Sequence, residues 1–515
     1  MTSPADPDAD SALMSSGLKR RALIGAGTIA MIAAIVLRFV ATSPLWLDEA
    51  LSVHIATGQM GLGDALRQDG HPGLYYVLLD DWTTIFGTGD HAVRALSGVL
   101  GVLTLPVLWL ATRRYGRPTT ICTLLLAATS PYLIRYSTET RMYALVVFLV
   151  AAAWWLVDSA WRRPTAARLV GVSVVTAALV HTHYWTFYLV AAGLVLVAAA
   201  GWRKPADQRR TARSILVAAA AGAATFIVWV PVFVDQLAHT GTPWAKRARP
   251  TEVFVETLQG IGGNNRFEGE TLGILLAFFA LLGALAVGVA QDRTIEIRST
   301  IAASMRPWAA ITVGALGLGA ATAIVTGGAF EARYAGIAVP FVLLMAGRGV
   351  AVLSPTARVV ALSLLVVLGL AISADEARRT RSQGQEVATA INARVAANDL
   401  ILFCPDQVGP ATVHYLDEAA AATARRAFPS GDGQTVDWRD YLDQVASVDP
   451  VEFANQADHD AGSGSIWFVS GVGYRGIDYS CGVINGQLAA VRTSEAVVGL
   501  QELFEGMYAT RYSPR

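Results

Sequence analysis

Long apolar stretches separated by short polar connections dominate the chain between residues 22 and 374. A helix needs about 20 apolar residues to cross the hydrocarbon core of a bilayer, and most of these stretches approach that length. With 53% hydrophobic and 16% charged residues, the chain of 515 residues is too apolar for a soluble protein. We therefore expect a polytopic membrane protein with about eleven transmembrane helices, near residues 22–40, 92–112, 119–134, 142–160, 167–182, 185–201, 213–234, 272–290, 308–326, 335–347 and 357–373.

The pattern changes after residue 374. The segment 375–515 is polar, and Gly, Asp and Ser divide it into short elements, among them the apolar runs at 399–404 and 465–470. Short apolar runs bounded by such residues are typical of buried strands in a small α/β domain. The predicted organisation is a tail at 1–21, a transmembrane domain at 22–374 and an α/β domain at 375–515.

Basic residues in alternate connections predict the orientation. Lys and Arg cluster before the first stretch, at 19–21, and again at 113–117, 162–168 and 203–213. Positively charged loops remain in the cytoplasm, so the amino terminus is expected inside. An odd number of spans then places residues 375–515 outside the plasma membrane. The polar leader before a full-length first stretch favours a retained anchor over a cleaved signal.

Charge and cysteine content narrow the picture further. The formal net charge is zero, which argues against nucleic acid as a partner. Of the three cysteines, Cys122 lies in an apolar stretch, whereas Cys404 and Cys481 fall in the external domain. Because thiols are not kept reduced outside the cell, we expect these two to form a disulfide; two unpaired buried thiols are the alternative.

The most informative polar residues are Asp48 and Glu49, which adjoin each other just after the first apolar stretch. Carboxylates at the edge of a membrane are costly unless they meet a cation, a metal or a substrate, so a functional interpretation is the default. Both are therefore candidate catalytic residues; for Glu49, the alternative is that it only holds an arginine or a metal in place.

Further acids, imidazoles, cations and tyrosines belong to connections on the same predicted side. They are His71, Glu139, Arg141, Tyr143, His183, Lys246, Arg247, Arg333 and Tyr334. A carboxylate can take the proton from an attacking hydroxyl while cations or a metal neutralise a departing phosphate. Nucleotide sugars are absent outside the cell, so this set predicts glycosyl transfer from a lipid phosphate.

Several motifs resemble those of the GT-C superfamily of glycosyltransferases, in the group with protein O-mannosyltransferases and lipid A aminoarabinose transferases. The matching segments are Trp46–Glu49, Gly70–Tyr76, Arg94–Ser97, Tyr136–Tyr143, His183–Tyr184 and Ala332–Tyr334. The resemblance implies a GT-C fold and inverting transfer from a polyprenyl-phosphate sugar, with Asp48 as the catalytic base. The chain departs from the pattern at Gly73, where family members often have a second proline, and at Gly70–His71, where lipid A transferases carry an acidic-basic pair.

We expect the remaining residues to serve the donor. Arg141, Arg333, His71, His183, Lys246 and Arg247 are candidates for binding its phosphate, and Glu139, Tyr143 and Tyr334 for supporting them. A divalent metal stays open, with Glu49, His71 and His183 as candidate ligands. Arg141 alternatively forms an ion pair with an acid of the first loop, and the basic loop near residue 246 alternatively is a solvated tip.

The sugar is expected to be mannose or arabinose, and the acceptor a glycan, lipid or protein. The alternative function is a carrier or flippase for lipid-linked saccharides, which should place polar groups at mid-membrane and contain repeats. Neither feature is visible in the sequence. The glycine-rich segment 471–476 fits a dinucleotide motif, but we expect no helix at 477–482, so nucleotide binding is not expected.

Overall fold

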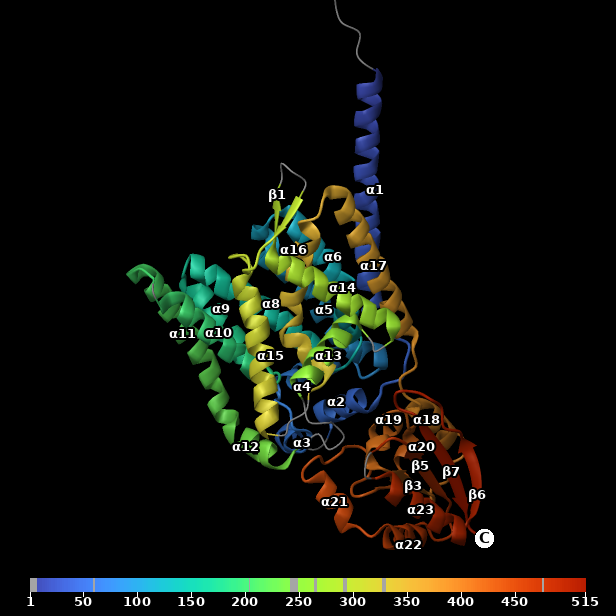
Figure 1. Cartoon of the computed structure of the whole chain (residues 1–515). Helices are drawn as coiled ribbons and strands as arrows, with labels where there is room; N and C mark the ends of the chain where they lie inside the picture. The colour runs from blue at the N-terminus through green and yellow to red at the C-terminus, as the bar shows by residue number, and fades with distance from the viewer. Residues whose placement is uncertain are drawn as a thin grey trace, which may run out of the picture.

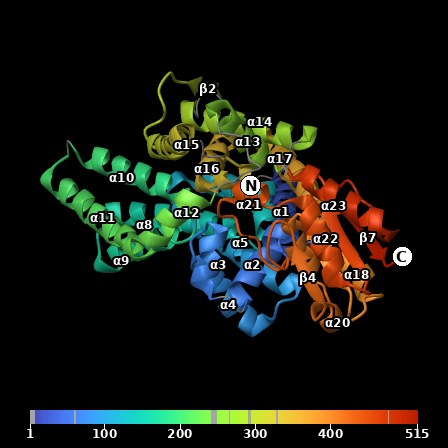
Figure 2. The same cartoon turned by 90° about the horizontal axis from the view of Figure 1, so that it is seen from below.

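A computed structural model of the chain describes residues 7–58, 61–202, 204–240, 249–263, 266–289, 294–326, 330–474 and 477–515. A helical bundle and a smaller α/β domain make up the molecule, and the domain lies at the opposite end of the bundle from the amino-terminal end of helix α1 (Figure 1). Seen from the domain's end, the α/β domain covers one side of the bundle, and helices α8 to α11 extend away on the other (Figure 2).

Each of the eleven predicted apolar stretches overlaps a helix, and several of them, among them 119–134 and 213–234, are divided between successive helical segments. The helices are α1 (Pro7–Leu37), α5 (Asp90–Thr112), α6 (Arg117–Ala128), α7 (Pro131–Ser137), α8 (Tyr143–Arg162), α9 (Ala166–Val180), α10 (Thr186–Trp202), α11 (Ala206–Ala224), α14 (Phe267–Leu285), α15 (Arg306–Thr326), α16 (Val339–Ala351) and α17 (Pro355–Arg378). In the described ranges, seven helical segments are long and apolar enough to cross a membrane. The expected polytopic helical architecture is confirmed.

Shorter helices occupy the connections. The first connection forms α2 (Leu47–Thr57), α3 (Leu62–Asp69) and α4 (Leu74–Phe86), which lie between the bundle and the α/β domain (Figure 1). Further along the chain come η2 (Thr225–Trp229), α12 (Val230–His239), α13 (Pro250–Gly262) and η3 (Ala332–Ile337). At the other end of the bundle, β1 (Ala286–Val289) and β2 (Thr294–Ile297) form an antiparallel hairpin.

The α/β domain contains a five-stranded sheet in the order β4-β3-β5-β7-β6. Its strands are β3 (Leu400–Cys404), β4 (Ala424–Ala427), β5 (Ile466–Gly471), β6 (Thr493–Val498) and β7 (Met507–Ser513). The first three pair in parallel, and β7 is antiparallel to both of its neighbours. Every residue of β3 and β5 is buried, as is typical of strands covered by helices on both faces.

Helices cover the two faces of this sheet. They are α18 (Gly384–Asn392), α19 (Gly409–Val413), α20 (Glu418–Ala421), α21 (Tyr441–Ser447), α22 (Pro450–Ala461) and α23 (Asp478–Val491). The sulfur atoms of Cys404 and Cys481 are bonded at 2.10 Å and link the end of β3 to α23. The expectation that no helix follows the glycine-rich turn was wrong, because α23 begins at Asp478 and buries Ile484 and Leu488 against the sheet.

Glycines allow close helix contacts inside the bundle. A Cβ atom on Gly283 of α14 would lie 1.8 Å from the carbonyl oxygen of Met345 in α16, and one on Gly349 would lie 1.9 Å from that of Phe279. Such backbone proximity is possible only without side chains, as in other membrane helix pairs with small residues at the interface.

We expect Gly283→Val to force α14 away from α16 and to destabilise the protein by at least about 1–3 kcal/mol. The measurement is the apparent Tm of the detergent-purified protein. It is obtained by heating samples and determining by size-exclusion chromatography how much protein remains unaggregated. Gly317→Val in α15 is the matched control, since a Cβ atom there would meet nothing within 4 Å. Equal Tm values for the two variants would contradict the close packing.

Candidate active site

A cavity of about 420 Å³ separates the first-connection helices from the α/β domain. Both parts of the molecule contribute to its walls, together with the connection that precedes α16. The lining residues are Trp46, Leu47, Asp48, Glu331, Arg333, Gln407, Trp438, Tyr441, Leu442, Val472, Gly473, Tyr474, Ile477, Phe504, Glu505 and Gly506. Of the residues predicted from the sequence, Asp48 and Arg333 therefore lie at the cavity itself.

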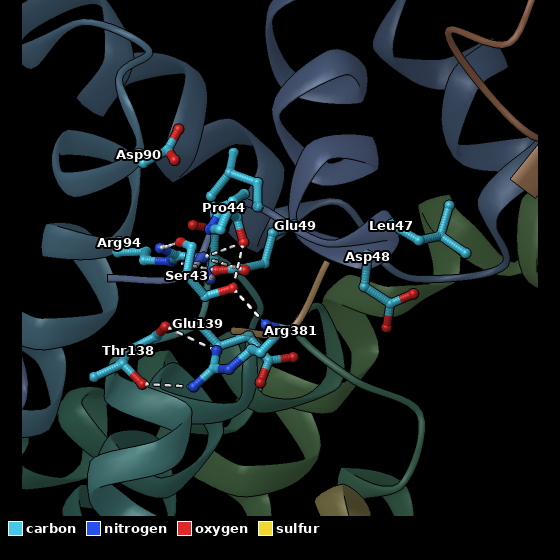
Figure 3. A network of polar contacts seen from close by, with 12 residues as sticks. Ser43, Pro44, Leu47, Asp48, Glu49, Asp90, Arg94, Thr138, Glu139 and Arg381 are labelled. Carbon is cyan, nitrogen blue, oxygen red and sulfur yellow. Dashed lines mark hydrogen bonds and ion pairs between the residues drawn. The ribbon is translucent and has the colours of Figure 1, made fainter. Parts of the chain in front are cut away.

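Asp48 and Glu49 occupy the first turn of α2, where negative charge is favourable next to the free N–H groups of a helix. Adjacent residues of a helix point about 100° apart, and the two carboxylates accordingly lie in different directions (Figure 3). Asp48 Oδ2 lies 3.2 Å from Arg333 Nη1 and 3.8 Å from Arg141 Nε. Two cations thus hold the Asp48 carboxylate at the cavity wall.

Glu49 lies away from the cavity and is fully buried. Arg94 donates to both of its oxygens, at 2.7 Å and 2.6 Å, and the N–H of Thr140 donates to Oε1 at 3.0 Å. Burial by itself would raise the pKa of the Glu49 carboxyl, but Arg94 lowers it below its usual value. Both oxygens are occupied, which corresponds to the alternative that Glu49 holds an arginine in place.

Arg141 and Arg333 bring unused hydrogen-bond donors to Asp48. Arg141 Nη1 donates to Ser52 Oγ at 3.1 Å and to Tyr76 Oη at 3.3 Å. The Nε atoms of both arginines are buried without a hydrogen-bond partner. A buried N–H that lacks a partner is costly, so this arrangement favours a ligand with acceptor oxygens.

His183 supplies a third open donor. Its Nδ1 accepts the N–H of Trp185 at 3.1 Å, so the proton of the neutral ring is on Nε2, which is buried without a partner. Burial and the nearby His71 lower the pKa of His183 well below its usual value. We refer to Arg141 Nε, Arg333 Nε and His183 Nε2 as the three open donors.

His71 adjoins this group, with its ring centre 5.8 Å from that of His183. Its Nδ1 lies 2.9 Å from Asp69 Oδ2, which also accepts a hydrogen bond from Tyr76. Burial would raise the pKa of Asp69, but His71 lowers it, and the resulting pKa is about 2. Asp69 remains charged and orients the His71 ring.

The three support candidates divide into two groups. Tyr334 and Tyr143 pack around His183 with ring centres at 5.1 Å and 5.9 Å. Glu139 is instead buried beside Arg135, at 3.5 Å, and does not line the cavity. The structure therefore brings the two tyrosines to the site and leaves Glu139 behind it.

Two residues that the sequence analysis did not select, Arg381 and Glu505, connect the α/β domain to this region; Figure 3 shows Arg381 among Ser43, Thr138 and Glu139. The backbone N–H of Arg381 donates to Ser43 Oγ at 2.8 Å, and its side chain donates to Thr138 Oγ1 at 3.2 Å. The Arg381 carbonyl accepts the N–H of Glu505 at 2.8 Å. Glu505 Oε1 in turn accepts the N–H of Leu47, the residue before Asp48, at 3.0 Å.

Two candidates for binding the donor phosphate, Lys246 and Arg247, lie outside the described residues.

The candidate metal ligands Glu49, His71 and His183 do not form a metal site. Glu49 is bound by Arg94, so it does not join His71 and His183 as a ligand. Among the described side chains, no group of three or more His, Cys, Asp or Glu residues has metal-binding geometry. These residues do not fit a resident divalent metal.

The bundle, the first-connection helices and the attached α/β domain define a polytopic membrane protein of the GT-C fold, as the sequence predicted. A family model described as dolichyl-phosphate-mannose-protein mannosyltransferase matches residues 70–232. That region covers α4 to α11 and includes His71, Arg141 and His183. No curated protein sequence matches the chain.

Solved structures of this fold resemble the chain over almost its whole length. The apo structure of ArnT from Cupriavidus metallidurans has a TM-score of 0.59 and 13% identity, covering 95% of this chain and 98% of ArnT. ArnT bound to undecaprenyl phosphate has a TM-score of 0.56 and 12% identity, covering 94% and 96%. The arabinofuranosyltransferase AftD from Mycobacteria has a TM-score of 0.52 and 13% identity, covering 96% of this chain and 41% of AftD.

We expect Glu49→Gln to lower stability by about 3–5 kcal/mol, because it leaves Arg94 buried without its counter-charge. The measurement is the apparent Tm of the purified protein. Glu495→Gln is the matched control: Glu495 also binds an arginine through both oxygens, at 2.8 Å and 2.6 Å, but 52% of its side chain is exposed, so little change is expected. A stable Glu49→Gln protein that is inactive would instead support a catalytic role.

Proposed function

We propose that this chain is an inverting glycosyltransferase that moves a sugar from a polyprenyl-phosphate donor to an acceptor hydroxyl outside the plasma membrane. The observation that carries the proposal is a carboxylate at a cavity wall paired with two arginines, each of which has a buried Nε atom without a hydrogen-bond partner. The description of the matching family and the binding of undecaprenyl phosphate by ArnT support a lipid-phosphate donor.

In this proposal, Asp48 is the general base. As the acceptor oxygen attacks the anomeric carbon, its proton passes to the Asp48 carboxylate. The bond between that carbon and the phosphate oxygen breaks, and the electron pair leaves with polyprenyl phosphate. A single displacement from the opposite face inverts the anomeric centre. The ion pairs with Arg333 and Arg141 orient the Asp48 carboxylate before the acceptor enters.

The same cations stabilise the departing phosphate. Two guanidinium groups meet at this point, and charge-assisted hydrogen bonds from them suit an anion whose charge grows as the bond breaks. Each of the three open donors would gain an oxygen of the phosphate as acceptor. His71, oriented by Asp69, would add another donor to the phosphate or face the sugar. Little reorganisation is needed because burial already fixes these groups.

The proposal extends to topology and substrates. The amino-terminal end of α1 would lie in the cytoplasm, with residues 22–374 in the membrane and 375–515 outside. The basic connections at 113–117 and 162–168 support this orientation. Mannose agrees with the description of the family model, and arabinose with AftD; the acceptor is a glycan, a lipid or a protein.

We expect Asp48→Asn to lower sugar transfer by about 10²- to 10⁴-fold, because the amide cannot accept the acceptor's proton. Membranes containing each variant are incubated with radiolabelled polyprenyl-phosphate mannose and, separately, arabinose, with and without chelator, and label is followed into acceptor fractions. Asp64→Asn on the exposed face of α3 is the matched control and should retain activity. Transfer that persists in Asp48→Asn would remove Asp48 as the base, and no transfer from either donor would favour a carrier.

We expect Arg333→Gln to weaken binding of polyprenyl phosphate by about 10- to 100-fold, because a charged donor to the phosphate is lost. Arg333→Lys should recover part of the affinity, since it keeps the charge but not the planar fork. Binding is measured by thermophoresis of the purified protein, with Arg298→Gln on the distant hairpin as control. Unchanged affinity in Arg333→Gln would place the phosphate elsewhere.

A further inference from the structure

The carboxyl ends of the parallel strands in the α/β domain face Asp48. In parallel sheets, ligands usually bind at this end. In the order β4-β3-β5, the chain passes from β3 to β4 on one side and then crosses to β5 on the other. The crevice beyond the carboxyl ends of β3 and β5 is therefore the topological switch point, the usual binding place in parallel sheets. Gln407 follows β3 and Val472 follows β5, and both line the cavity.

Aromatic rings form much of the cavity lining. Trp46 precedes the catalytic helix, and Phe504 from the α/β domain meets it edge to face, with ring centres 5.1 Å apart. Phe504 is 65% exposed although it is large and apolar. Tyr441 and Tyr474 also line this space. The faces of aromatic rings are electron-rich and attract the weakly positive C–H groups of a sugar ring.

Glu505 also lines this crevice. Its side chain is buried, with Oε1 bound to the N–H of Leu47, whereas Oε2 has no hydrogen-bond partner. Burial raises the pKa of this carboxyl to about 8, so the proton it holds near neutrality limits repulsion with Asp48. The Gln407 amide lies in the same wall. Both groups suit hydroxyls that donate and accept.

We propose that this crevice is the acceptor site and that it holds a saccharide, one hydroxyl of which reaches Asp48. The inference rests on the proposed transferase function and adds the chemical class of its acceptor. The ring of the acceptor lies against Phe504 and Trp46, and its other hydroxyls bind Gln407 and Glu505. The α/β domain thereby supplies half of the active site.

A peptide acceptor fits this space less well. Extended peptides commonly add to an exposed strand edge, and the edges of this sheet are β4 and β6. Neither strand contributes a residue to the cavity. A space of about 420 Å³ with aromatic walls and a few polar groups matches the general form of a small-ligand site. The switch-point crevice, not an edge, faces Asp48.

The test uses the full-length protein in lipid nanodiscs with polyprenyl phosphate present, so that the donor site is filled and no turnover occurs. A panel of α-linked manno- and arabino-oligosaccharides, and a serine- and threonine-containing peptide, are titrated by saturation-transfer NMR. We expect at least one oligosaccharide to bind and the peptide not to bind. Phe504→Ala should weaken saccharide affinity by about two- to tenfold and leave polyprenyl phosphate binding intact.

Tyr479→Ala is the matched control, because Tyr479 is an 80% exposed aromatic residue of the same domain that does not line the cavity. It should bind the saccharide as the wild type does. Binding of the peptide alone, binding of no oligosaccharide, or equal saccharide affinity in Phe504→Ala would each overturn the inference. Binding of polyprenyl phosphate to the wild type is measured first, so failure of the proposed donor chemistry is recognised separately.

Discussion

The buried ion pair between Glu49 and Arg94 is the interaction on which the geometry of the site depends. It joins α2 to α5 and, through the N–H of Thr140, to the segment that presents Arg141. A buried charge pair contributes little net stability, but either charge alone would be very costly. The pair therefore fixes the rotation of α2 about its axis, and that rotation directs the neighbouring Asp48 to the cavity.

The α/β domain is part of the same construction. Arg381 and Glu505 connect its sheet to Ser43, Thr138 and Leu47 around the start of α2. Asp48 is thus held from two directions, by the bundle on one side and by the α/β domain on the other. Rigid support from both sides suits a reaction in which a hydroxyl must approach one carbon along one line.

Particular residues show how far the sequence could predict this structure. The apolar stretches predicted nearly every helix of the bundle, because the length of an apolar stretch can be read directly from consecutive residues. Asp48, Arg141, Arg333 and His183 were recognisable because charge and imidazole groups are costly at a membrane edge. The partner of Glu49 was not recognisable, since Arg94 lies 45 positions away. The contact between Glu505 and Leu47 was not recognisable either, because 458 positions separate them and no local pattern marks Glu505. The helix after the glycine-rich turn was missed although Cys481, Ile484 and Leu488 have helical spacing.

The hydrogen bond from Leu47 to Glu505 also bears on how the protein is made. Domains form in the order of synthesis, amino-terminal parts first. The helix that carries Asp48 is synthesised early, yet the acceptor for the N–H of Leu47 arrives only with residue 505. In a partly translated chain, Asp48 is consequently not yet fixed in position. Under the proposed function, biosynthesis itself would delay the consumption of the lipid-linked sugar until the last domain has folded.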